Sequence, residues 1–178
     1  ESPRDTVLAR LTVGSYPTST AVNPLDNKVY VSGDYSTVTI IDCAADSLVG
    51  VVIADCDNVC YNSTDGVVYC TDDRGVVAVV DGATDKVVAA VASRDLPYAF
   101  CYVPQHNKVY CACYHSRAVV VVDAVTNALL ARVPVGLGSR NLCYNPSGDK
   151  VYCVNELSGT MTVIDAATDT VLTTVEDV

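Results

Sequence analysis

The hydrophobic positions of this chain fall in short runs, each bounded by residues that favour turns. In the last quarter of the chain these runs cover residues 141–144, 150–154, 160–164 and 170–175. Between them lie Asn-Pro-Ser-Gly-Asp (145–149), Glu-Leu-Ser-Gly (156–159) and Asp-Ala-Ala-Thr-Asp (165–169). No helical period of about 3.6 residues extends over a useful length. The pattern predicts four antiparallel β-strands, here named A to D in chain order, joined by tight turns.

The same pattern occurs four times. A Val-Tyr pair recurs at 29–30, 68–69, 109–110 and 151–152, with spacings of 39, 41 and 42 residues. A second anchor, two apolar residues followed by aspartate, ends at Asp42, Asp81, Asp123 and Asp165. Because two independent anchors keep the same step, the chain is a repeat protein of about 41 residues per unit. Four short antiparallel strands per unit are typical of the blades of a β-propeller, so an all-β propeller is expected.

The repeat divides the chain, taken as one domain over 1–178, into four blades at 15–54, 55–92, 93–134 and 135–178. Residues 1–14 are left over, and they resemble the last D strand. The matching positions are Thr6, Val7, Leu8 and Leu11 in the first segment and Thr170, Val171, Leu172 and Val175 in the second. This predicts an extra N-terminal D-type strand, giving five D strands for four sets of A, B and C.

Three explanations fit the extra strand. The chain is part of a longer propeller, or the strand adds to a blade edge of the same ring, or it adds to the edge of a neighbouring molecule. An unpaired strand edge is a template for another chain. We favour docking onto a blade edge over a fragment of a longer propeller.

The strand B segments also resemble a known family. The steps Tyr30-Val31-Ser32-Gly33, Tyr69-Cys70-Thr71-Asp72, Tyr110-Cys111-Ala112-Cys113 and Tyr152-Cys153-Val154-Asn155 are similar to the Tyr-Val-Thr-Asn step of the YVTN β-propeller repeats. The resemblance covers nearly the whole chain and implies a secreted or surface protein of bacteria or archaea, with about seven blades in the usual case. This sequence departs from the family in having four full repeats and cysteine where the motif has valine.

Six cysteines flank the A–B turns: Cys60 and Cys70, Cys101 and Cys111, Cys143 and Cys153. With the last turn centred near Gly148, the two cysteines of each pair lie opposite each other, at a separation that a disulfide can bridge. In the first repeat both positions lack cysteine, at Ala21 and Val31. Joint presence or absence favours three disulfides, and buried free thiols that act as small apolar residues are the alternative.

Three further cysteines, Cys43, Cys56 and Cys113, are not repeated. Cys56 and Cys113 are expected on the same face of adjacent blades, where they could meet. Because the total of nine is odd, at least one thiol is free or bonds another molecule. Contact of Cys43 with a stacked subunit is one hypothesis, and a plain free thiol is the alternative.

The composition of the chain narrows the range of partners and locations. The net charge of −10 argues against nucleic acid or an anionic membrane as partner, because those surfaces require Lys and Arg. No apolar run approaches the roughly 18 residues of a membrane helix. Nine cysteines in a chain of this size favour an oxidising compartment. We therefore expect an extracellular or cell-surface protein of a prokaryote, in a mature form after removal of a signal peptide.

The sequence offers little chemistry. A metal site at Cys111, Cys113 and His115 is conceivable, but Cys111 has a better use opposite Cys101, so no metal, cofactor or catalytic residue is predicted. The repeated aspartates are assigned to turn hydrogen bonds, since catalysis requires one asymmetric site. Asn62-Ser63-Thr64 is a possible glycosylation sequon. A possible partner face consists of non-repeated residues in the D–A connections: Tyr16, Arg94, Tyr98, Phe100 and Arg140.

These observations predict a non-enzymatic, exported structural or interaction protein. The favoured hypothesis is self-assembly into a chain or filament by docking of the extra terminal strand between propeller subunits. One alternative is a binding module that recognises a glycan or a protein through its D–A loops. A fragment of a larger propeller enzyme is the other, and it would require a cluster of non-repeated polar residues at the central channel.

Overall fold

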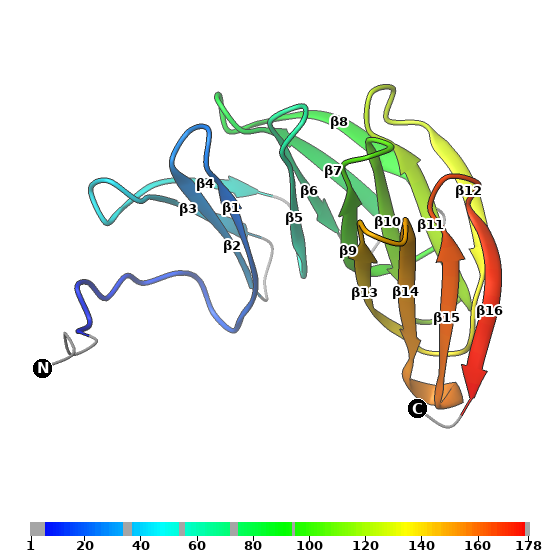
Figure 1. The fold of residues 1–178 in the computed structure, drawn as a ribbon. Coiled ribbons are helices and arrows are strands. Elements are labelled where there is room, and N and C mark those ends of the chain that lie inside the picture. Colours follow the sequence, from blue (N-terminus) through cyan, green and yellow to red (C-terminus); the bar gives the residue numbers. More distant parts are fainter. Residues whose placement is uncertain (1–5, 34–36, 54–55, 72–74, 94, 177–178) are drawn as a thin grey trace, which may run out of the picture.

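The structure, a computed structural model, describes residues 6–33, 37–53, 56–71, 75–93 and 95–176. Within these residues the fold is all β, with four four-stranded antiparallel sheets in which the strands follow chain order. Figure 1 shows the sheets side by side along an open arc, with blade 1 at one end and blade 4 at the other. The β-propeller architecture and the ABCD order within each blade, both predicted from the repeat, are therefore confirmed.

The sheets fall inside the four repeat ranges. Blade 1 consists of β1 (Pro17–Asn23), β2 (Lys28–Gly33), β3 (Thr37–Asp42) and β4 (Ser47–Ile53). Blade 2 consists of β5 (Val59–Asn62), β6 (Val67–Thr71), β7 (Val76–Asp81) and β8 (Lys86–Ala92). Blade 3 consists of β9 (Pro97–Val103), β10 (Lys108–Cys113), β11 (Ala118–Asp123) and β12 (Leu129–Pro134). Blade 4 consists of β13 (Ser139–Asn145), β14 (Lys150–Asn155), β15 (Thr160–Asp165) and β16 (Thr170–Glu176), with a short 3₁₀ helix η1 (Glu156–Ser158) between β14 and β15.

Each pair of neighbouring blades encloses one apolar layer. The repeated tyrosines of strand B, Tyr30, Tyr69 and Tyr110, are at most 1% exposed and lie in these layers. β-Branched valines fill most of the remaining positions, as expected for a pleated surface buried on both faces. The assignment of these tyrosines to blade packing is confirmed.

The repeated aspartates close the C–D turns. The Oδ1 atom of Asp42 accepts hydrogen bonds from the backbone N–H groups of Ala44 (2.7 Å) and Ala45 (2.9 Å). In the other three blades, the N–H of Thr84, Thr126 and Thr168 donates in the same way to Asp81, Asp123 and Asp165. These Asx turns confirm the structural role predicted for the aspartates.

The predicted N-terminal strand is not formed. Residues 1–5 lie outside the described part of the chain, and residues 6–14 belong to no sheet. Val7 and Leu8 are 72% and 86% exposed. In this chain each blade already has its own D strand, so no blade has a vacant fourth position for the segment.

The A–B turns differ from the predicted register by one residue. In blade 4, Asn145 pairs with Lys150, so the loop is residues 146–149 and its centre lies between two residues. The Oδ1 atom of Asn145 accepts the N–H of Ser147 (3.0 Å), and Asp149 has φ of +49°. Because side chains alternate along a strand, a shift of one residue moves each one to the other face of the sheet.

The described part of the chain contains no helix long and apolar enough to cross a membrane.

Candidate functional site

Strands β1, β5, β9 and β13 are the innermost strands of the four blades and contact one another in sequence. The first residues of β9 and β13, the B–C turn of blade 4 with its flanking strands, and Asn58 of the connection into β5 line a hollow of about 780 Å³. We name it the D–A pocket. Its lining comes from blades 2, 3 and 4: Asn58, Tyr98, Ala99, Arg140, Asn141, Val154, Asn155, Glu156, Gly159, Thr160 and Met161.

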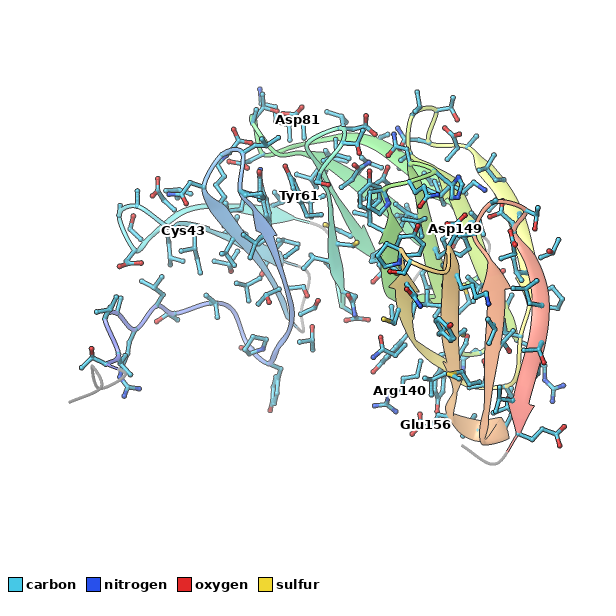
Figure 2. The ribbon with its side chains drawn as sticks, viewed as in Figure 1. Cys43, Tyr61, Asp81, Arg140, Asp149 and Glu156 are labelled. Carbon is cyan, nitrogen blue, oxygen red and sulfur yellow. The ribbon has the colours of Figure 1, made fainter. Side chains whose placement is uncertain are left out.

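Arg140 and Glu156 form an ion pair at this pocket. The Nη1 atom of Arg140 lies 2.7 Å from Oε2 of Glu156, and the two side chains are 51% and 45% exposed. Figure 2 shows both residues at the end of blade 4 opposite to the turn that carries Asp149. The carboxylate raises the pKa of Arg140, so the guanidinium keeps its charge. An exposed pair of this kind contributes little to stability and leaves both groups accessible to a ligand.

Aromatic rings extend the pocket toward blade 3. The guanidinium carbon of Arg140 lies 5.6 Å from the ring centroid of Tyr98, within the range of a cation–π contact. Tyr98 contacts Tyr114 at 5.8 Å between centroids, and Tyr114 meets His115 edge-on at 5.0 Å. Tyr98 is 42% exposed, so these neighbours cover part of its side chain and leave part of it open to solvent.

Hydrogen bonds fix the side chains of two asparagines in the pocket lining. Asn155 is fully buried, and its Nδ2 donates to the hydroxyl oxygens of Thr160 (3.1 Å) and Thr162 (2.9 Å). Across the pocket, Oδ1 of Asn58 accepts a hydrogen bond from Ser19 at 3.1 Å. These contacts fix two asparagines before any ligand binds, which lowers the entropic cost of binding.

The structure brings together two of the five residues of the predicted partner face, Tyr98 and Arg140. Phe100 is partly buried and packs against Tyr69 at 6.5 Å between centroids, so it belongs to blade packing. Tyr16 is 70% exposed but does not line the pocket. Arg94 lies outside the described residues.

Asn58, Glu156 and Met161 line the pocket but were not predicted from the sequence. A signal was available only for Glu156, because the matching position of the blade 3 turn is Tyr114, so the acidic residue does not repeat there. Glu156 begins η1, which ends at Gly159 with φ of +60°. The short helix places Glu156 within reach of Arg140.

The predicted cysteine pairing is wrong. Cys143 lies opposite Tyr152, and Cys153 lies opposite Leu142. The same holds in blades 2 and 3, where Cys60 and Cys101 face Tyr69 and Tyr110, while Cys70 and Cys111 face Val59 and Phe100. All nine cysteines are free thiols. The shifted register places the two cysteines of each hairpin on opposite faces of the sheet, so they cannot bond each other.

The other three cysteines are also separated. Cys56 lies in the apolar layer between blades 1 and 2, and Cys113 lies in the layer between blades 2 and 3, so the predicted meeting of these two is wrong. The Cys56 thiol instead neighbours Cys70, and this contact, together with burial, raises the pKa of Cys70. Cys43 is exposed in the first C–D turn.

Asn62 does not present a glycan acceptor in the folded chain. The residue is fully buried, and its Nδ2 donates to Asp65 (2.9 Å) and to Asn107 of blade 3 (3.1 Å). The sequon was therefore misread, since its asparagine is an Asx-turn residue like Asn23 and Asn145. Among the described residues, no cluster of three or more His, Cys, Asp or Glu is placed to hold a metal.

No protein-family model matches the chain, and no curated protein matches it either. Solved structures, in contrast, match the chain. Hydrazine synthase of Kuenenia stuttgartiensis superimposes with a TM-score of 0.80 at 17% identity, over 96% of this chain and 52% of that one. The Cps50 (Swd1) β-propeller domain of Myceliophteria thermophila gives 0.80 at 16% identity, over 97% and 58%. The chain thus spans little more than half the length of either structure, and the likeness shows the β-propeller fold alone.

Proposed function

We propose that this β-propeller is a non-enzymatic interaction domain that binds an extended protein segment in the D–A pocket. The observation that carries the proposal is the convergence of Tyr98, Arg140 and Asn58, from three blades, on one hollow whose lining also includes the apolar Ala99, Val154 and Met161. An aromatic ring, a guanidinium and amides suit a peptide, because the ring packs on a side chain while the amides pair with its backbone.

Arg140 offers a binding point for an acidic group of the segment. Arg140 is half exposed and already holds a carboxylate, that of Glu156, at 2.7 Å. A carboxylate of the ligand can share or replace that partner in the bidentate geometry that arginine offers. Tyr98 beside it supplies the kind of aromatic anchor that dominates binding energy in protein interfaces.

The test is selection of a random peptide library on the whole chain, followed by affinity measurement of the selected peptides. Tyr98→Ala and Arg140→Ala should each weaken binding by about tenfold or more. Tyr16→Ala, at an exposed tyrosine that does not line the pocket, is the control and should change nothing. Peptide binding that survives both pocket substitutions would refute the site. Binding on a glycan array that is lost with Tyr98→Ala would favour the glycan alternative.

Self-assembly through the N-terminal segment is a second candidate, supported by a separate observation. Thr6, Val7 and Leu8 repeat the sequence of β16, yet they pair with no strand and remain exposed. β16 is the outermost strand of blade 4, and its Leu172 is 49% exposed. The segment of one molecule can therefore pair along the free edge of β16 in another and build a chain or filament. Light scattering with and without residues 1–14 tests this, because only strand docking requires the segment.

The YVTN resemblance and an exported, extracellular location remain part of this proposal. They rest on the strand B motifs alone, because nine free thiols do not support an oxidising compartment. Fractionation of the source cells, with the chain detected by antibody, would test the location.

A further inference from the structure

The blades are joined by a polar contact that repeats at the same position of each interface. Between blades 1 and 2, Tyr30 Oη donates to the carbonyl oxygen of Gly82 (3.1 Å) and to Asp85 (2.8 Å), and Lys28 Nζ contacts the same two residues. Between blades 3 and 4, Tyr110 and Lys108 make the same contacts with Ala166 and Asp169. We name this arrangement the blade clasp. It consists of a Lys and a Tyr of strand B and, from the next C–D turn, a carbonyl and a carboxylate.

At the interface between blades 2 and 3, the lysine and the aspartate of the clasp are both replaced by uncharged residues. Blade 2 has Val67 in place of the lysine, and blade 3 has Asn127 in place of the aspartate. Tyr69 Oη still reaches the carbonyl of Ala124, at 3.5 Å, while Oδ1 of Asn127 is buried without a partner among the described residues. A lysine in the clasp is thus matched by aspartate, and an apolar residue by a neutral amide.

The two ends of the arc carry the two unused halves of a clasp. On blade 4, Lys150 and Tyr152 occupy the donor positions, and neither has a hydrogen-bond partner among the residues that the structure describes. On blade 1, Cys43 and Asp46 occupy the acceptor positions, and both are exposed. Asp46 has φ of +46°, like Asp85 (+58°) and Asp169 (+58°), so its backbone already has the clasp conformation.

The apolar surfaces around these half-clasps are also uncovered. Val154 and Val175 on the free face of blade 4 are 46% and 39% exposed, whereas their counterparts in blade 3, Ala112 and Val133, are 0% and 2% exposed. On the free face of blade 1, Ile41 is partly exposed, whereas the matching Ile164 of blade 4 is fully buried. Figure 2 shows Cys43 at the blade 1 end of the arc, away from blade 4.

We infer that blade 4 of one copy of this chain packs on blade 1 of a second copy, with Lys150 and Tyr152 of the first bound to Asp46 and the Cys43 carbonyl of the second. The occupant is a second copy because the rule that pairs lysine with aspartate is met by the chain's own two ends. The two contacting surfaces differ, so the interface is head to tail, and two copies can satisfy both of their ends at once by closing a ring. Such a ring has eight blades, within the usual range of about four to eight.

This contact goes beyond the proposed function and is separate from strand docking. It joins blade faces and leaves residues 6–14 unused, so an assembly that persists without residues 1–14 is expected. It also covers part of the blade 4 wall of the D–A pocket, since Val154 lines both surfaces. Peptide binding and assembly are measured separately, so failure of one does not imply failure of the other.

The experiment is a charge exchange read by light scattering over a range of concentrations. Lys150→Asp and Asp46→Lys each place like charges at the interface, and each variant alone should be monomeric where the unmodified chain has twice the monomer mass. A mixture of the two variants restores both contacts and should return the doubled mass. Arg117 already holds a long basic side chain at φ of +52°, so lysine at position 46 is compatible with the turn. Lys86→Asp, at an exposed lysine of β8, is the control and should assemble like the unmodified chain.

A monomer at all concentrations would overturn the inference. An assembly that both charge variants retain, or that the mixture does not restore, would overturn it as well. Circular dichroism of each variant before mixing shows whether it is folded. The mixture keeps the test valid for a destabilised variant, because recovery of the doubled mass requires the complementary charge.

Discussion

The hydroxyl group of Tyr110 in blade 3 donates a hydrogen bond to the carbonyl oxygen of Ala166 in blade 4, at 3.2 Å. Tyr110 is fully buried, and its hydroxyl also contacts Asp169. Burial and the neighbouring carboxylate raise the pKa of Tyr110, so the hydroxyl remains a donor across the physiological range. One side chain therefore fills the apolar layer and satisfies a turn carbonyl of the next blade.

Tyr110→Phe should destabilise the chain by about 1–3 kcal/mol, because it removes a buried hydrogen bond to a charged carboxylate and leaves Lys108 as the donor to Ala166 and Asp169. The measurement is the free energy of unfolding in urea. Tyr152→Phe is the matched control, since Tyr152 occupies the same position in blade 4 and has no hydrogen-bond partner among the described residues. At concentrations where the chain is monomeric, the control should lie within about 0.5 kcal/mol of the unmodified chain. Equal losses in both variants would show that the hydroxyl contact across the blades is not the cause.

The interface between blades 2 and 3 lacks the lysine–aspartate pair, so the pair can be introduced there by substitution. Val67→Lys alone should be destabilising, because a partly buried ammonium would face the neutral Asn127. Asn127→Asp alone leaves a carboxylate opposite valine and should also be unfavourable. Together they recreate the pair that Lys108 and Asp169 form at 2.8 Å, and the coupling energy in a double-mutant cycle should be about 1 kcal/mol or more. Additive effects would show that the lysine and the aspartate do not depend on each other.

The chain should become less stable at acidic pH, because the aspartates of the C–D turns become protonated. Hydrogen bonds from the following threonine lower the pKa of Asp81, Asp123 and Asp165 below the ordinary carboxyl value of about 3.9. A carboxyl group whose folded pKa is depressed stabilises the fold above its unfolded pKa, and this contribution is lost as the pH falls through the folded value. The melting temperature should therefore change little with pH near neutrality, where these groups contribute their full stabilisation, and should fall below about pH 4.

The triple substitution Asp81→Asn, Asp123→Asn and Asp165→Asn separates this effect from general acid denaturation. An asparagine oxygen can accept the same backbone hydrogen bonds but does not titrate in this range. The variant should be less stable near neutral pH, and its curve should approach that of the unmodified chain in acid. Parallel curves at all pH values would exclude these three carboxylates as the titrating groups.

The repeat was readable from the sequence because every blade uses the same residues for the same purpose. The last blade was predicted at 141–144, 150–154, 160–164 and 170–175, and its strands end within two residues of those limits. The Val-Tyr and Asp anchors correspond to the apolar layers and the Asx turns. The periodic pattern of buried positions was therefore sufficient to predict the fold.

The candidate site could be predicted only in part, because it consists of residues that are not repeated from blade to blade. Tyr98 and Arg140 stood out as unrepeated residues of the D–A connections, but Phe100 did too, and it is used in packing against Tyr69. Phe100 lies opposite Cys111 in the regular ladder, whereas Tyr98 falls at the irregularity between Pro97 and Ala99, which the sequence does not reveal. The register of the A–B hairpins was a second difficulty. That register was misjudged by one residue, because a turn centre near Gly148 does not distinguish a loop with an even number of residues from one with an odd number.

The register error has a direct consequence for thiol chemistry. With no disulfides, all nine cysteines should react with a thiol reagent after denaturation without reductant. In the folded chain, the exposed Cys43 and Cys143 should react first. Burial raises the pKa of Cys60 to about 11 and that of Cys101, Cys113 and Cys153 to about 12, so few of these thiols are thiolates near neutral pH. Mass spectrometry after timed alkylation identifies the order. Six cysteines that stay unmodified even in the denatured, unreduced chain would instead establish three disulfides and contradict the register.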